Sequence, residues 1–300
     1  MATKIPTFTY TGEYSTEMKN GYWHILFKTS GTLTMGYAKT ADVFLCGGGG
    51  GGKANGGGGG GGGYTRTQRG IRIGANEPYS IVVGSGGAIN QAGGASKAFG
   101  YEAAGGQTGG GSHVRSGGAG GSGGGAGNCA DYGKGGTGGA NGGNGGGGST
   151  NEFPAGGSGQ GRTTRAFEEA SYPLYAGGGG GDSYGNQPAP GGEGGGGRGG
   201  YSYVGAGSWG AASNGVANTG GGGGGGPHHD DAQRYAGTGG SGIVILRGTQ
   251  DDLLPIFFDG TQLSAVVWNG KKLSGLIYGG QRIFSRMGRA LRERRLAYGI

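Results

Sequence analysis

The sequence has little of several things that would place it in a familiar class. Two cysteines, Cys46 and Cys129, cannot form the disulfide framework of a small secreted domain. They are either buried thiols or one bridge, and we favour free thiols. Only 8 prolines, with glycines that do not recur at every third position, exclude collagen. No run of about 18 apolar residues occurs, so we expect no membrane insertion. A hydrophobic content of 32% argues against one large core.

Positive charge is scarce except at one end. Lys271, Lys272 and six arginines follow Trp268, against the single acid Glu293, and this excess equals the formal net charge of +7. The remaining residues are balanced, so the basic character is local and we expect no nucleic-acid partner. The first residues lack an apolar stretch, which predicts no secretory signal.

Glycine is what the sequence has in excess. There are 91 glycines, and most lie between residues 47 and 242 in runs such as 47–52, 56–63 and 220–226. Glycine loses more backbone freedom on folding than any other residue, and its runs offer no side chain to bury. One interpretation is therefore a disordered linker.

The alternative is a bundle of polyglycine-II helices. Such helices have three residues per turn, no internal hydrogen bonds, and N–H and C=O groups that point outward. Without Cβ atoms, neighbouring helices can approach and bond laterally on every side. Aromatic residues interrupt the glycine runs and strand-like segments flank them, so we favour the bundle.

Short alternating or apolar segments predict strands on both sides of the glycine-rich region. They are residues 7–10, 22–28, 32–35, 42–46, 64–73, 79–83 and 242–247. Residues 42–46 are continuously apolar after Asp42, which predicts a strand buried on both faces. About 155 residues separate the last two strands, and so long an insertion fits a compact domain only if it is itself structured.

A ten-residue repeat follows residue 250. Phe258, Trp268 and Tyr278 each precede a dipeptide, Asp-Gly, Asn-Gly or Gly-Gly, that favours a type I′ hairpin turn. These units predict a small meander or a stacked stem, which cannot bury much surface alone. Residues 285–300 are the best candidate for a helix. It is a frayed basic helix, one that docks on another protein, or, least favoured, one that binds nucleic acid.

Several short patterns resemble catalytic or metal-binding motifs but lack the residues or the spacing that those motifs need. Residues 47–53 lack the Ser or Thr that a phosphate-binding loop needs after its lysine. Residues 228–231, His-His-Asp-Asp, are adjacent metal ligands without further spacing and predict a polar turn at the tip of the bundle. His24 and His113 have no triad partners, and Glu168 and Glu169 would face opposite ways on a strand. We therefore expect no catalytic residue, no metal and no cofactor, and hence no enzyme.

A family resemblance rests on motifs outside the glycine runs. Residues 23–27, 30–34 and 42–46 running into polyglycine, then 79–87, 174–181, 217–226 and 240–245, resemble glycine-rich tail proteins of phages and prophages. The resemblance implies a tail-fibre or tail-tip adhesin of the virion, made in the host cytoplasm. Loops at the bundle end would contact a bacterial receptor, either a glycan or an outer-surface protein.

The expected fold is therefore mainly β, a small β-sandwich with an inserted bundle of polyglycine-II helices, then β-hairpin repeats and a short C-terminal helix. The domain boundaries we expect are 1–84 for sandwich strands with the first glycine runs, 85–240 for the glycine domain, 241–249 for the closing strand, 250–285 for the repeats and 286–300 for the basic tail. Two other functions stay open: a purely structural spacer, and a disordered RNA-binding protein.

Under the adhesin hypothesis the variable loops are residues 97–107, 128–134, 151–175, 182–190 and 226–235. The candidate receptor-binding residues are Tyr101, Tyr132, Phe153, Phe167, Tyr172, Tyr184, Trp209, His228, His229 and Tyr235. The other expected partners are tail proteins and further copies of the chain, with a trimer favoured. The candidate oligomer or attachment residues are Phe258, Trp268, Tyr278, Arg289, Arg292 and Arg295.

Overall fold

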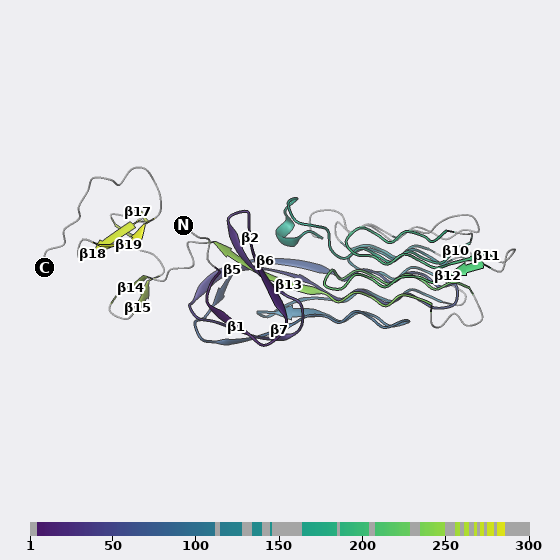
Figure 1. Cartoon of the computed structure of the whole chain (residues 1–300), viewed down its shortest axis with the longest axis horizontal. Helices are drawn as coiled ribbons and strands as arrows, with labels where there is room; N and C mark the ends of the chain where they lie inside the picture. Colours follow the sequence, from purple (N-terminus) through teal and green to yellow (C-terminus); the bar gives the residue numbers. More distant parts are fainter. Residues whose placement is uncertain are drawn as a thin grey trace. The chain divides into compact units, whose positions relative to one another are not determined.

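The computed structural model of the chain comprises two compact units, Met1–Gln250 and Asp251–Ile300 (Figure 1). In the first unit it describes residues 5–111, 115–127, 134–139, 145, 164–184, 187–203, 208–228 and 235–249. In the second it describes the strands alone. Within these residues no helix has the length and apolar character needed to traverse a bilayer.

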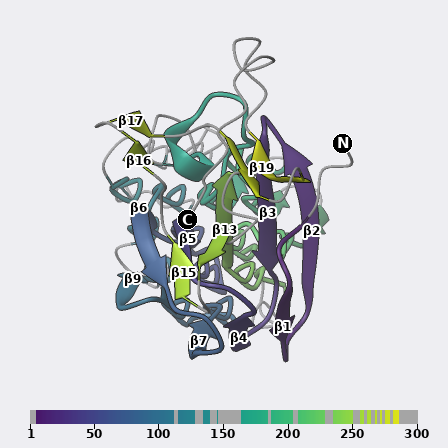
Figure 2. The same ribbon diagram turned by 90° about the vertical axis from the view of Figure 1, so that its left-hand side faces the viewer.

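Two five-stranded antiparallel sheets form a sandwich in the first unit (Figure 2). The first sheet has the order β1 (Phe8–Tyr10), β4 (Gly31–Met35), β7 (Pro78–Val82), β8 (Ser96–Ala98) and β9 (Tyr101–Ala103). The second has the order β2 (Tyr14–Lys19), β3 (Tyr22–Phe27), β13 (Ile243–Thr249), β5 (Lys39–Cys46) and β6 (Thr65–Ile73). The mainly-β prediction is confirmed, and all seven expected strands are present.

The sandwich core lies between the sheets. Trp23 and Phe27 of β3 and Leu33 and Met35 of β4 are completely buried. Tyr10 of β1 contacts Phe27 with ring centroids 4.6 Å apart, which joins the two sheets. Burial of each large apolar side chain contributes about 1.5–3 kcal/mol, so this core anchors the chain at the base of the glycine-rich region.

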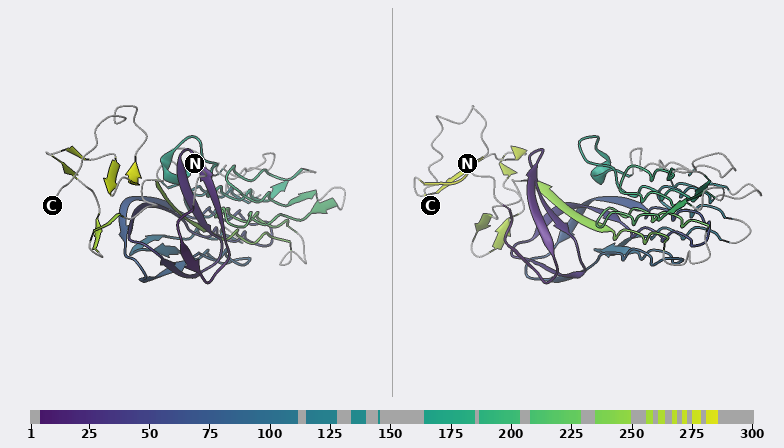
Figure 3. Two further views of the ribbon diagram at one scale, coloured as in Figure 1. Left: turned by 60° about the vertical axis from the view of Figure 1, so that its left-hand side comes forward. Right: turned by 45° about the vertical axis from the view of Figure 1, so that its right-hand side comes forward.

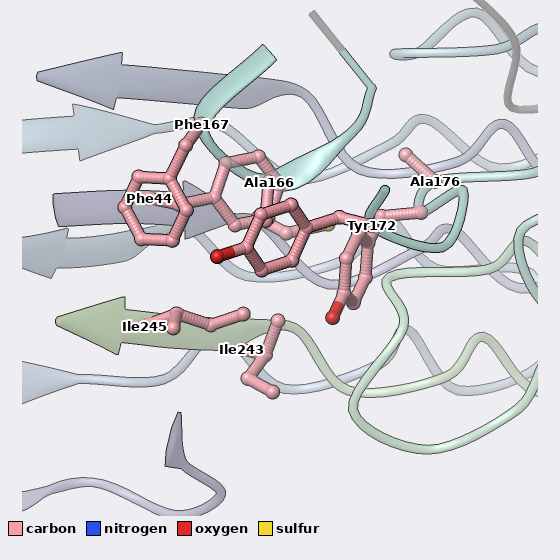
Figure 4. Packing of buried hydrophobic residues seen from close by; sticks show 9 residues of the cluster. Phe44, Ala166, Phe167, Tyr172, Ala176, Ile243 and Ile245 are labelled. Carbon is pink, nitrogen blue, oxygen red and sulfur yellow. The ribbon is translucent and has the colours of Figure 1, made fainter. Parts of the chain in front are cut away.

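The opposite face of the second sheet is also covered. Residues 164–176, here called the covering segment, fold back over β5 and β13 and include a short 3-10 helix, η1 (Ala166–Glu168). Figure 4 shows Phe167 and Tyr172 of this segment over Phe44, Ile243 and Ile245 of the strands. The strand at 42–46 is therefore buried on both faces, as its apolar run predicts.

The glycine runs form extended rods with a three-residue period. The N–H groups of residues 47, 48 and 49 donate to three different neighbouring segments, and those of residues 50, 51 and 52 donate to the same three in the same order. The acceptors are the carbonyl oxygens of Tyr64, Gly94 and Gly240, then of Gly61, Gln91 and Gly237, at 2.8–3.0 Å. A period of three is that of a polyglycine-II helix.

Each inner rod also accepts hydrogen bonds from further neighbours. The carbonyl oxygens of residues 48–50 accept from the N–H groups of Gly106, Gly87 and Gly223. Rod 47–52 thus has six neighbours, three antiparallel and three parallel to it. A Cβ atom on Gly50 would lie 2.1 Å from the carbonyl oxygen of Gln107, so only glycine allows this spacing. Lateral bonding of this kind, rather than a disordered linker, is what the described residues show.

The rods run alternately away from the sandwich and back to it (Figure 3). The chain leaves at Cys46, turns at residues 53–56 and returns to β6, and later excursions repeat this path until β13. One end of the bundle therefore meets the sandwich, and the other consists of turns. We call this second end the far end, and its described residues include 53–56, 182–184, 187–188, 201–203, 208–210, 227–228 and 235.

The second unit contains three hairpins. They are β14–β15 (Ile256–Phe258, Thr261–Leu263), β16–β17 (Val267–Trp268, Lys271–Lys272) and β18–β19 (Gly275–Tyr278, Gln281–Ser285). Two residues separate the paired ends of each hairpin, as the turn dipeptides predict. Among the described strands of this unit, each sheet has two strands. Residues 286–300 of the expected helix lie outside the described residues.

Candidate functional site

A small three-stranded sheet lies at the far end of the bundle (Figure 1). It consists of β10 (Ser183–Tyr184), β11 (Tyr201–Tyr203) and β12 (Ser208–Gly210). The N–H of Ser183 donates to the carbonyl of Gly200 at 3.0 Å, and the N–H of Gly200 donates to Gly225 at 2.8 Å. The far-end sheet is therefore a direct continuation of the rods that carry it.

An aromatic pair stands beside this sheet. Trp209 of β12 and Tyr235 pack with ring centroids 4.3 Å apart, and both residues are half-buried. The N–H of Ala212 donates to the carbonyl of Tyr235 at 2.9 Å, which fixes the backbone of the pair. Trp and Tyr supply large contact area at small entropy cost, so a fixed and partly exposed pair is suited to binding.

Exposed polar residues also lie at the far end, the end that carries the Trp209–Tyr235 pair. Asn55 is exposed in the turn at residues 53–56, with a φ of 58° that asparagine tolerates well. His228 is exposed as the predicted polar turn requires, and Gln187 is exposed after β10. The far end thus combines aromatic and hydrogen-bonding groups.

Asp182, at the end of its rod, is a buried carboxylate that sequence reasoning missed. It is 0% exposed, and neither carboxylate oxygen has a hydrogen-bond partner among the described residues. Burial raises the pKa of Asp182 well above its ordinary value. The nearby Arg115 guanidinium opposes this shift, as do the backbone N–H groups of His228 and Ser183, which approach the carboxylate without reaching hydrogen-bond geometry. The one feature of the sequence that indicates this burial is that Asp182 directly follows the glycine run 177–181, since closely packed glycine rods exclude solvent.

The structure brings only some of the predicted receptor-binding residues to the far end. Trp209, His228 and Tyr235 lie there, and the backbone of Tyr184 lies in β10. Tyr101 lies on β9 of the sandwich, so loop 97–107 is not a far-end loop. Tyr132, Phe153 and His229 lie outside the described residues.

Phe167 and Tyr172 correct the prediction directly. They are 0% and 3% exposed, because the covering segment buries them against the sandwich. These two side chains are therefore structural and do not present a receptor-binding surface. The sequence does carry a signal of this burial, because Phe167, Tyr172 and Tyr175 lie close together in a short segment.

A buried ionic network holds the covering segment. Arg247 of β13 is 1% exposed, and its guanidinium lies 2.7 Å from a carboxylate oxygen of Glu169 and 3.3 Å from one of Asp42. The guanidinium also stacks 3.9 Å from the centre of the Phe167 ring. The hydrogen bond from Arg247 lowers the pKa of Glu169. The network fastens the segment to the sheet, and the arginine at its centre is buried.

The attachment candidates fall in the second unit. Phe258, Trp268 and Tyr278 each end the first strand of a hairpin, so the three occupy equivalent positions. Arg289, Arg292 and Arg295 lie outside the described residues. Across the part of the chain that is described, no three His, Cys, Asp or Glu residues gather as metal ligands.

Comparison with known proteins places most of the chain in one family. A family model described as a glycine-rich domain matches residues 28–249, from the end of β3 to the end of β13. No curated protein matches the chain.

Proposed function

This chain belongs to the glycine-rich domain family, and we propose that its bundle holds a receptor-binding surface at the far end. In this proposal the protein is a tail-fibre or tail-tip protein of a phage or phage-like particle, and it binds a glycan or protein on the bacterial surface. It acts by binding and not by catalysis. The resemblance of residues 23–46 and 240–245 to phage tail proteins supports this assignment.

The observation that carries the proposal is the Trp209–Tyr235 pair. It is half-exposed, and it stands at the end of rods whose backbone groups bond to one another laterally. A surface held rigid before binding loses little entropy when it binds. Aromatic residues of this kind commonly dominate binding energy at interfaces.

Cell binding tests the proposal. Fluorescently labelled protein should bind cells of the bacterial strain that encodes the chain, or of its close relatives. Trp209→Ala combined with Tyr235→Ala should weaken binding by about tenfold or more. Tyr37→Ala is the matched control, because Tyr37 is 37% exposed but lies in the sandwich.

The outcomes separate the two functions. Equal binding by the double variant and the parent, with the thermal midpoint unchanged in both, would exclude the far-end surface. Absence of binding to every strain would favour the alternative, a structural spacer within the tail.

We further propose that the hairpins of the second unit attach the chain to copies of itself or to other tail proteins, with a trimer favoured. Isolated two-stranded hairpins are marginally stable in water, so three of them need surface from a partner. Sedimentation of the full chain should give a trimer mass, and Phe258→Ser with Trp268→Ser should shift it toward the monomer. A monomeric parent protein would reject self-association.

A further inference from the structure

A hollow lies at the edge of the sandwich, on the unit's other end from the far-end surface. Its volume is about 600 Å3, and its wall comes from β6, β7 and the β8–β9 turn. Figure 2 shows β6, β9 and β7 next to one another along this edge. β6 and β9 are the outermost strands of their sheets, so the hollow forms where the two sheets approach each other.

Three aromatic rings line or border this hollow. Tyr79 and Phe99 pack with ring centroids 5.3 Å apart, and Tyr101 lies next to them on β9. The hydroxyl of Tyr79 donates to Glu77 at 2.6 Å and accepts from the N–H of Gly74 at 2.8 Å, so its ring is fixed in place. The wall is therefore a preformed aromatic surface.

Phe99 occupies a backbone conformation that disfavours it. Ala98 pairs with Tyr101, so Phe99 and Gly100 form a two-residue turn, and their φ values are 52° and 80°. Such a turn favours Asn, Asp or Gly at its first position, and a bulky residue there costs roughly 1 kcal/mol. Strain retained at a surface aromatic residue points to a use for its ring.

Two arginines supply positive charge beside the rings. The guanidinium of Arg66 lies 4.9 Å from the centre of the Tyr101 ring, and Arg72 lines the hollow itself. Both side chains are exposed, and no ion pair involves either one within the described residues.

The acids near the hollow are already engaged. Lys97 and Glu102 neutralise each other at 3.1 Å, and Glu77 accepts the Tyr79 hydroxyl. Arg72 lines the hollow and takes part in none of the ion pairs of the described residues, so it can bind an anion there. Guanidinium groups suit carboxylate and phosphate geometry.

We propose that this hollow binds a saccharide that carries a carboxylate or phosphate group. The rings would stack on the apolar face of a sugar, and Arg72 would bind its anionic group. This site is independent of the far-end surface, since it uses none of the same residues. The open, shallow shape and the fixed rings suit a short stretch of a polysaccharide chain.

Calorimetric titration of the full chain tests the proposal. The probes are an oligogalacturonate, a phosphorylated maltooligosaccharide, a neutral maltooligosaccharide and an acidic peptide. At least one anionic saccharide should bind, and the two anionic probes distinguish carboxylate from phosphate. The neutral sugar should bind about tenfold more weakly or not at all.

Two variants make the result decisive. Phe99→Asn relieves the turn strain, so it should maintain or raise the thermal midpoint while it weakens saccharide binding by about tenfold. Arg72→Gln should remove binding, whereas Arg198→Gln, at an exposed arginine on the bundle, should not.

The proposal is overturned if neither anionic saccharide binds, if only the acidic peptide binds, or if Phe99→Asn binds as the parent does. Trp209→Ala should leave this affinity unchanged. The hollow and the far-end surface can thus fail separately.

Discussion

The Nε2 atom of His24 lies 2.6 Å from the hydroxyl oxygen of Tyr172, although 148 residues separate them in the chain. His24 belongs to β3 of the sandwich and Tyr172 to the covering segment, and both are buried. The contact shows that the segment between the glycine rods packs against the outer face of the second sheet. The stability of the sandwich and the position of this segment are therefore coupled.

Acid should destabilise the protein through His24. Burial lowers the pKa of His24 to about 4, and the charges of Arg247 and Lys19 add to this shift, with Glu169 opposing it. The unfolded chain takes up a proton near pH 6.5 and the folded chain does not, so this stability is present above pH 6.5 and is lost as the pH falls toward 4. The loss is roughly 3 kcal/mol.

Urea unfolding at pH 7 and pH 4.5 measures this dependence. His24→Gln should lose less stability between the two pH values than the parent does. His228→Gln, at an exposed histidine, should behave as the parent. An equal pH slope for His24→Gln and the parent would contradict the assignment.

Alanine at an inner glycine should disrupt the bundle. The Cβ atom in Gly50→Ala would lie 2.1 Å from the carbonyl oxygen of Gln107, so a rod must move and lateral hydrogen bonds must break. We expect a loss of about 3 kcal/mol or more. Gly139→Ala is the matched control, because its Cβ would lie 3.2 Å from the ring of the exposed Tyr64 and 3.4 Å from the carbonyl oxygen of Gly120, far less close than at Gly50. Equal unfolding midpoints for the two variants would refute the close approach of the rods.

Amide exchange should be slow along the inner rods. The N–H groups of residues 47–52 and 58–63 all donate to carbonyls of neighbouring rods. Opening one rod breaks bonds to three neighbours together, so exchange should approach the rate that global unfolding allows. Hydrogen exchange followed by mass spectrometry should protect these residues as well as β13. Exchange at the rate of an unfolded chain would support the disordered alternative.

Cys46 should be unreactive until the protein unfolds. The thiol is free and buried, and burial raises its pKa to about 12. In a Cys129→Ser background, alkylation at pH 7.5 should be slower than for an ordinary thiol by about a thousandfold or more. Denaturant should restore the ordinary rate. Fast labelling of the folded chain would show that the base of the bundle is open.

Neutralising Asp182 should stabilise the far end. Its raised pKa means that its favourable contribution is present at low pH and is lost as the pH rises through the folded-state pKa. Asp182→Asn should therefore raise stability at pH 7 by about 1 kcal/mol or more, with little effect near pH 3. Asp42→Asn should act in the opposite direction at pH 7, because Asp42 pairs with Arg247. A destabilising Asp182→Asn would show that a partner holds the charged carboxylate.

The sequence predicts the strands well where apolar residues alternate or cluster. Residues 22–28 and 242–247 show this, and they pair in the structure as β3 and β13. The sequence did not predict β2, because Ser15, Thr16 and Glu17 are polar. β2 is the edge strand of its sheet and buries few side chains, so its sequence shows no alternation of apolar and polar residues.

The arrangement of the rods could not be predicted from the sequence. Glycine residues are identical to one another, and the rods pair through backbone hydrogen bonds, which do not depend on the side chain. For the same reason the sequence could not show which aromatic residues lie at the candidate site. Phe167 and Trp209 are both aromatic residues among glycines, yet one is fully buried and the other lies at the far end.

The three-residue period of the rods limits how related chains can vary in length. One added residue in an inner rod would rotate each later N–H by a third of a turn, toward the wrong neighbour. Three added residues restore the direction of every donor and extend the rod by about 9 Å. Insertions and deletions among relatives should therefore come in triplets within rods and in any number at the turns.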